Sequence, residues 1–181
     1  MRLIATAALV GLMLHEAPSA LAKQPTVVDV PNGPAFVQLP GRKEVNARSG
    51  QDLFDNTVLR TSKPGRMQIK LSSGRQFRMG GNALLQLKNS TVTLKRGALI
   101  GWIQPGLKNR QPFTIQTRLA TASIQGTTVF IELDDDKLKV FSGEGEVNVA
   151  TTSGESYTLQ SGEQLLVELN QPMITWSSPV K

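Results

Sequence analysis

The side chains of this chain that could do chemistry are carboxylates, because other reactive groups are nearly absent. The chain has 181 residues, no cysteine and a single histidine, His15. His15 lies in an N-terminal segment that we expect to be removed, so the mature chain offers no Ser-His-Asp or Cys-His catalytic set and no zinc site built on histidine or cysteine. We predict a protein that is not an enzyme and that carries no cofactor.

Two groups of carboxylates remain as candidates for a metal or catalytic site. Asp134, Asp135 and Asp136 could supply oxygen ligands to Ca²⁺. However, consecutive side chains diverge, and the spacing does not match a loop with alternating aspartates, so a solvated hairpin turn explains them better. Asp52 and Asp55 could be proposed as a glycosidase pair. That mechanism needs two carboxyls facing each other across a cleft, and nothing in the sequence brings in the second.

Glycine-rich pieces are weak candidates for phosphate-binding loops. Gly80-Gly81 and Gly143-Glu144-Gly145 are not followed by a helical pattern, and no Gly-Lys-Ser or Gly-Lys-Thr appears. They are more simply explained as glycines of tight turns. Gly126-Thr127 lies inside an apolar run, which predicts a bulge or a close backbone contact.

The elements that would position these residues are strands. From Arg66 onward, apolar residues alternate with polar ones, as in Met67, Ile69 and Leu71, which is typical of half-buried strands. Turn signals such as Ser73-Gly74 separate the apolar runs. The pattern predicts an all-β fold of about ten to twelve short strands. It does not decide between a β-solenoid-like roll and a β-sandwich.

The N-terminus is typical of a signal peptide for export. Arg2 gives it a positive charge, Leu3–Leu14 an apolar core, and Ala20-Leu21-Ala22 a cleavage site. The apolar core is shorter than the ~20 residues of a membrane helix. We expect a cleaved signal, no transmembrane helix after cleavage, and a periplasmic or secreted protein.

The chain divides into four predicted parts. Residues 1–22 form the signal peptide, and residues 23–50 an N-terminal extension with edge strands, since prolines recur there. Residues 51–169 form the β domain, and residues 170–181 an irregular tail.

Charge is distributed unevenly along the chain, which has a formal net charge of +6. No acidic residue lies between Asn56 and Ile131, whereas carboxylates dominate from Glu132 to Glu168. The basic run could form a surface for an anionic partner. Alternatively, basic and acidic strands are neighbours and neutralise each other. The candidate surface residues are Arg66, Lys70, Arg75, Arg78, Lys88, Lys95 and Arg96.

Outside the cytoplasm, an anionic partner means acidic glycans, lipopolysaccharide phosphates or anionic lipid head groups. Nucleic acid is not expected, because aromatic residues make up only 5% of the chain and stacking platforms require them.

The order of short motifs resembles that of the FecR domain family of periplasmic regulators. The resemblance covers about residues 45–168, and no single motif carries it alone. The matching pieces are Leu59-Arg60-Thr61, Pro64-Gly65-Arg66, Ser73-Gly74-Arg75, Gly81-Asn82-Ala83, Leu94-Lys95-Arg96-Gly97, Phe113 to Thr117, Ala120 to Thr127, Val140 to Gly143, Gly145-Glu146-Val147 and Leu159 to Gln164.

The resemblance implies a β-rich body without catalytic residues, in which Gly126, Thr127, Gly143, Gly145 and Gly162 belong to structural motifs of the family. Regulators of this family also carry a cytoplasmic sigma-factor-binding segment and a membrane helix, neither of which is expected here. It implies an exported binding module for an envelope protein or receptor, acting in signalling or assembly. The alternative is a module that binds glycan or lipopolysaccharide through the basic strands.

Overall fold

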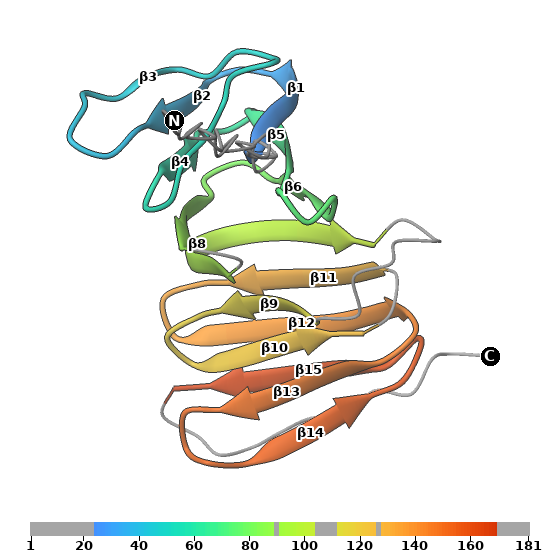
Figure 1. The fold of residues 1–181 in the computed structure, drawn as a ribbon. Helices are drawn as coiled ribbons and strands as arrows, with labels where there is room; N and C mark the ends of the chain where they lie inside the picture. Colours follow the sequence, from blue (N-terminus) through green and yellow to red (C-terminus); the bar gives the residue numbers. More distant parts are fainter. Residues whose placement is uncertain (1–23, 89–90, 104–111, 126–127, 170–181) are drawn as a thin grey trace, which may run out of the picture.

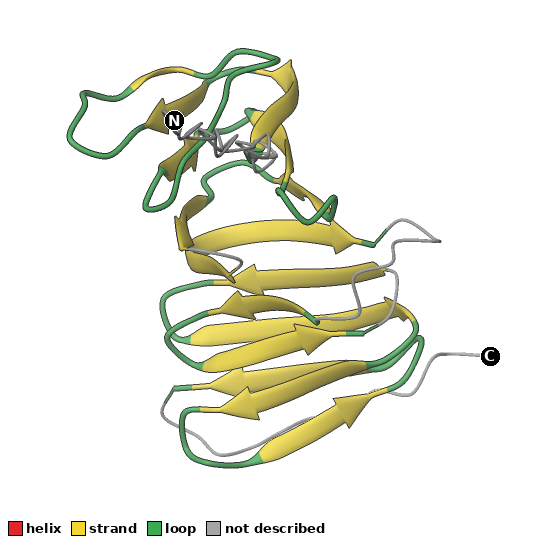
Figure 2. Ribbon diagram, in the orientation of Figure 1, coloured by secondary structure: helices red, strands yellow, loops and turns green. Residues whose placement is uncertain are grey.

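The structure is a computed structural model that describes residues 24–88, 91–103, 112–125 and 128–169. Throughout these residues the chain forms strands and loops without a helix (Figure 2). The predicted all-β class is confirmed. The strands are β1 (Thr26–Asn32), β2 (Ala35–Gln38), β3 (Val45–Asn46), β4 (Val58–Thr61), β5 (Arg66–Lys70), β6 (Gln76–Met79), β7 (Leu84–Lys88), β8 (Thr91–Trp102), β9 (Phe113–Gln116), β10 (Ala120–Ile124), β11 (Thr128–Leu133), β12 (Lys137–Glu144), β13 (Val147–Thr151), β14 (Ser156–Leu159) and β15 (Gln164–Glu168).

The strands make two sheets that share one strand. Sheet A has the order β1-β5-β6-β8-β11-β12-β15, and sheet B the order β3-β2-β4-β7-β8-β9-β10-β13-β14. All pairings are antiparallel except that of β8 with β9. The strands follow one another along an elongated stack that runs from β1 to β15 (Figure 1). Both sheets stay open, so the fold is not a closed barrel.

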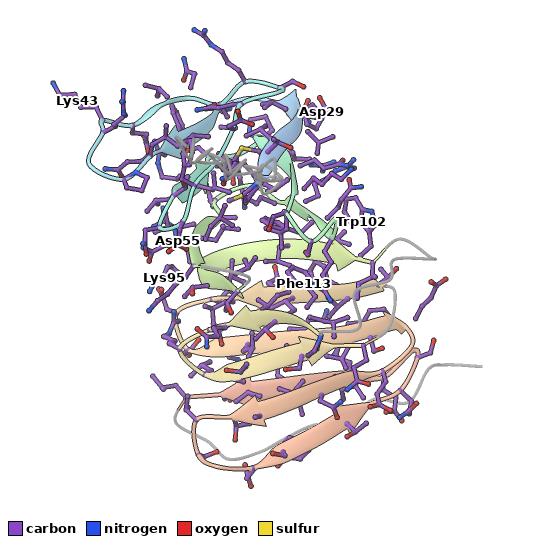
Figure 3. The ribbon with its side chains drawn as sticks, viewed as in Figure 1. Asp29, Lys43, Asp55, Lys95, Trp102 and Phe113 are labelled. Atoms are coloured by element: carbon purple, nitrogen blue, oxygen red, sulfur yellow. The ribbon has the colours of Figure 1, made fainter. Side chains whose placement is uncertain are left out.

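The hydrophobic core lies between the two sheets, because alternate residues of each strand point inward. On β11 of sheet A, Val129, Ile131 and Leu133 are fully buried. On β9 of sheet B, Phe113 and Ile115 are fully buried as well. The sheet spacing of about 10 Å is filled by such side chains from both inner faces. Figure 3 shows Phe113 directed into the body of the molecule.

Strand β8 turns the corner between the two sheets at Gly97. Its first half pairs with β7 and β9 of sheet B, and its second half with β6 and β11 of sheet A. Gly97 has a φ of +84°, and a Cβ there would lie 2.5 Å from the Cα of Ala83. Only glycine fits such a backbone and such a close approach. The Arg96-Gly97 pair therefore makes a bend within one long strand and not a turn between two strands.

The described residues form fifteen strands, where about ten to twelve were expected. Several strands have only two to four residues, and three strands lie between residues 26 and 46, where an extension with edge strands was expected. There, β2 is paired on both sides, with β3 and β4. The predicted signal peptide and C-terminal tail lie outside the described residues.

Candidate interaction surface

The outer face of sheet A carries a row of four large side chains, three apolar ones with an arginine at one end. Arg78 on β6, Ile100 on β8, Phe130 on β11 and Phe141 on β12 are successive cross-strand partners. Directly opposed residues point to the same face. This face is the outer one, because the alternate residues of these strands fill the core. Ile100 is 43% exposed, and both phenylalanines are half-buried.

Basic groups border this row. Arg66 and Arg78 line a hollow of about 240 Å³ together with Ile100 and Phe130. Toward the β12 end of the row, the Lys139 ammonium lies 5.9 Å from the centre of the Phe130 ring, which allows a cation–π contact. We call the set of Arg66, Arg78, Ile100, Phe130, Lys139 and Phe141 the Ile100 face.

The predicted basic residues do not form one surface. Arg66, Lys70 and Arg78 lie on sheet A, in strands β5 and β6. Lys95 lines a separate hollow with Arg118, next to threonines of sheet B. Figure 3 shows Lys95 and Trp102 near opposite ends of β8.

The other three basic residues of the predicted surface are also apart from the Ile100 face. Lys88 is exposed at the end of β7. Arg96 lines a third hollow, which it shares with Lys63 and the aspartates of the β11–β12 turn. Arg75 is only 4% exposed, and its burial lowers the pKa of its guanidinium. Its guanidinium is therefore not presented on the outer surface of the molecule.

The basic strands are also not neutralised by the acidic ones through ion pairs. Lys139 and Glu132 are cross-strand partners, yet their charged groups form no ion pair. Among the described residues, Arg66, Arg78 and Lys139 have no ion pair with a carboxylate. The cations that border the Ile100 row are therefore available to a partner.

In the described part of the basic run, one residue forms an ion pair, and it lies at the β1–β4 end of the molecule. Arg60 donates two hydrogen bonds to the Glu44 carboxylate, of 3.0 and 2.5 Å, and its guanidinium lies 4.1 Å from the centre of the Phe36 ring. The hydrogen bonds from Arg60 hold the pKa of Glu44 below its usual value.

The candidate carboxylates lie in two different loops, one before β4 and one between β11 and β12. Asp134, Asp135 and Asp136 are exposed in the β11–β12 hairpin, where the Asp134 amide donates to the Lys137 carbonyl at 2.9 Å. Asp52 makes an isolated backbone bridge with Thr26. No group of three or more potential metal ligands comes together within the described ranges.

Two of the family glycines belong to one structural junction at the end of the stack. The buried Ser142 hydroxyl donates to the Gly145 carbonyl at 3.0 Å, and the Gly162 amide donates to the Ser142 carbonyl at 2.7 Å. Gly145 and Gly162 both have positive φ. Gly143 lies next to this junction, and its carbonyl accepts a hydrogen bond of 3.0 Å from the Ser161 hydroxyl. Gly126 and Thr127 lie outside the described residues.

A second junction joins two motifs at the start of the body. The Thr61 amide donates to the Ala83 carbonyl at 2.9 Å, and the Ala83 amide donates to the Thr61 hydroxyl at 3.1 Å. Thr61 also donates to the Gly80 carbonyl. Thr61 and Ser142 are thus the polar side chains that tie motifs together. Their side chains are only 1% and 0% exposed. Nothing in the sequence apart from the motifs that contain them predicts this burial.

No helix long and apolar enough to cross a membrane occurs among the residues that the structure describes.

Comparison with known proteins gives one family and one fold. The family model described as FecR protein matches residues 57–148. Two crystal structures, at 2.50 and 1.65 Å resolution, of a protein described as a "putative anti-sigma factor" from Parabacteroides distasonis share the fold. Each has a TM-score of 0.58 and 17% sequence identity over 67% of this chain. The chain spans 59% of the length of that protein. No curated protein matches.

Proposed function

This chain belongs to the FecR family, and from that premise we propose that it is an exported, non-catalytic adaptor that binds another protein in envelope signalling or assembly. The observation that carries the proposal is the family match, which spans the stack from β4 to the first residues of β13. The protein that shares the fold is described as a "putative anti-sigma factor", and anti-sigma factors are a regulatory class and not a catalytic one. Direct control of a sigma factor is not part of the proposal.

The fold supports protein binding in two ways. Strands β14 and β15 end the stack, and each pairs with a strand on one side only in the described part of the chain. Such edges can accept a strand from a partner. The Ile100 face supplies an exposed apolar row with polar borders, as interaction sites on soluble proteins do.

The alternative function, binding of glycan or lipopolysaccharide through the basic strands, has less support. An anionic polymer or membrane surface is bound by several cations on one face. Here Lys88, Lys95 and Arg96 lie away from Arg66 and Arg78, and Arg75 is buried. We therefore do not propose it as a second function.

The proposal is tested in the organism that encodes the chain. A C-terminally tagged full chain should be recovered from the periplasm or the medium, and mass spectrometry should place its N-terminus at Lys23. Chemical cross-linking in intact cells, followed by affinity capture, should then yield one or a few envelope proteins reproducibly. Retention of the chain in the cytoplasm, or capture at the level of an untagged strain, would contradict the proposal.

A further inference from the structure

The Ile100 face combines an apolar floor with basic groups that form no ion pair with a carboxylate of the described ranges. Ile100 and Phe130 are exposed or half-exposed, although they are cross-strand neighbours that could pack under a covering element. Each Å² of apolar surface that these two side chains leave in water forgoes about 25 cal/mol of favourable burial free energy. A surface of this kind gains free energy when a partner covers it.

The cations define the chemistry of that partner. Arg66 and Arg78 line the same hollow as Ile100 and Phe130. Arg78 donates one hydrogen bond, of 2.7 Å, to the Gln68 side-chain carbonyl, which leaves further guanidinium N–H groups for a ligand. Paired guanidinium groups beside an apolar floor favour a carboxylate next to an aliphatic or aromatic group.

The size and the charge count favour a peptide over a membrane. The hollow of about 240 Å³ has room for one or two side chains. Anionic membranes are recognised by clusters of roughly four to eight Lys or Arg residues. The outer face of sheet A offers Arg66, Lys70, Arg78 and Lys139, and this count is offset by Asp29 and Glu132 on the same sheet.

We infer that the Ile100 face is the docking site for an extended acidic–apolar segment of the partner protein. An aliphatic or aromatic side chain of that segment covers Ile100 and Phe130, and an adjacent carboxylate pairs with Arg66 and Arg78. This inference rests on the proposed protein-binding function and names the surface and the chemistry of the partner.

A peptide selection tests the inference without knowledge of the partner. A phage-displayed library of random dodecapeptides is selected against the full chain. The selected peptides should be enriched in Asp or Glu next to Phe, Leu, Ile or Trp. Their affinity should fall about tenfold or more on Ile100→Asp and on the Arg66→Glu/Arg78→Glu double variant. Selection against the double variant should shift the enrichment from acidic to basic residues.

Matched controls come from the outer face of sheet B. Thr121→Asp and Lys95→Glu introduce the same acidic residues at a half-buried position of β10 and an exposed position of β8. They should change affinity by less than about twofold. Ile100 is a surface residue, so Ile100→Asp should leave the thermal midpoint close to that of the wild type, and a folded variant is required for the comparison.

Several results would overturn the inference. One is that the selected peptides bind the Ile100→Asp variant as well as the wild type. Another is that the selected peptides lack acidic residues. A third is tight binding of the chain to phosphatidylglycerol vesicles without enrichment of any peptide. A dimer that dissociates on Ile100→Asp would assign the face to a second copy. Envelope-protein capture that is unchanged by Ile100→Asp would overturn this inference alone, whereas loss of all capture by the wild type would contradict the proposed function.

Discussion

Phe77 of sheet A and Phe113 of sheet B stack across the core with their ring centroids 6.3 Å apart and their planes inclined by 20°. Both rings are fully buried. Since the two strands that carry them belong to different sheets, this contact joins the sheets directly behind the strands that hold the Ile100 face.

Phe113→Ala should destabilise the protein strongly. Loss of a buried ring removes its transfer free energy and leaves a cavity, which costs about 3–5 kcal/mol. Urea denaturation at equilibrium measures the loss. Phe54→Ala is the matched control, because Phe54 is 45% exposed, and it should cost less than about 1 kcal/mol. Similar losses for the two variants would contradict the packing described.

Gly101 makes room for the Phe113 ring. A Cβ at Gly101 would lie 2.8 Å from a Phe113 ring carbon and 3.3 Å from the Cγ1 of Val129. Gly101→Ala should therefore destabilise the protein by about 1–3 kcal/mol through overpacking. The Gly101→Ala/Phe113→Leu double variant should lose less unfolding free energy than the sum of the two single losses, because the smaller leucine side chain relieves the crowding. Additive losses in a double-mutant cycle would contradict the close approach.

Gly97→Ala should disrupt the corner of β8. Gly154→Ala is the control, since Gly154 also has a positive φ, of +97°, but has open space at its Cβ position. The control should lose about 1–2 kcal/mol for the backbone conformation alone. Gly97→Ala should lose more, because its Cβ also meets the Cα of Ala83. Equal shifts of the urea midpoint would show that the contact with Ala83 does not constrain the strand.

The Glu44–Arg60 pair should contribute a small, pH-dependent stability. Because the folded-state pKa of Glu44 is lowered, the contribution is present above the unfolded-state pKa and is lost as the pH falls through the folded-state pKa. Glu44→Gln should cost about 0.2–1 kcal/mol near neutral pH, since the pair is exposed to solvent. The difference between wild type and variant should vanish in acid and shrink in high salt. A stability difference between wild type and Glu44→Gln that grows in acid would contradict a lowered pKa of Glu44 in the folded state.

The strand pattern could be predicted from the sequence, because residues such as Met67, Ile69 and Val129 alternate with polar ones. The second half of β8 escaped that pattern. Its outward positions hold Ile100 and Trp102, so apolar residues occupy both faces and no alternation is visible. Ile100 is also the most exposed apolar residue of the candidate surface. The alternation of apolar and polar residues therefore could not predict this surface.

The basic surface could not be predicted because neighbours in sequence go to different sheets. The acid-free run from Asn56 to Ile131 crosses both sheets, so Arg78 and Lys95 reach opposite outer faces. Arg75 lies in the loop before β6 and is buried by tertiary packing. Its burial does not follow from its position in the sequence.

In-cell photo-cross-linking tests the central claim, that this FecR-family chain binds another protein through the outer face of sheet A. A photoreactive amino acid is placed at Ile100 in one strain and, as the control, at Thr121 on the opposite sheet in another. Both strains are irradiated, and the adducts are identified by mass spectrometry. Docking on the Ile100 face predicts a defined adduct with an envelope protein from Ile100 and none from Thr121. No adduct from Ile100, or the same adduct from both positions, would contradict it.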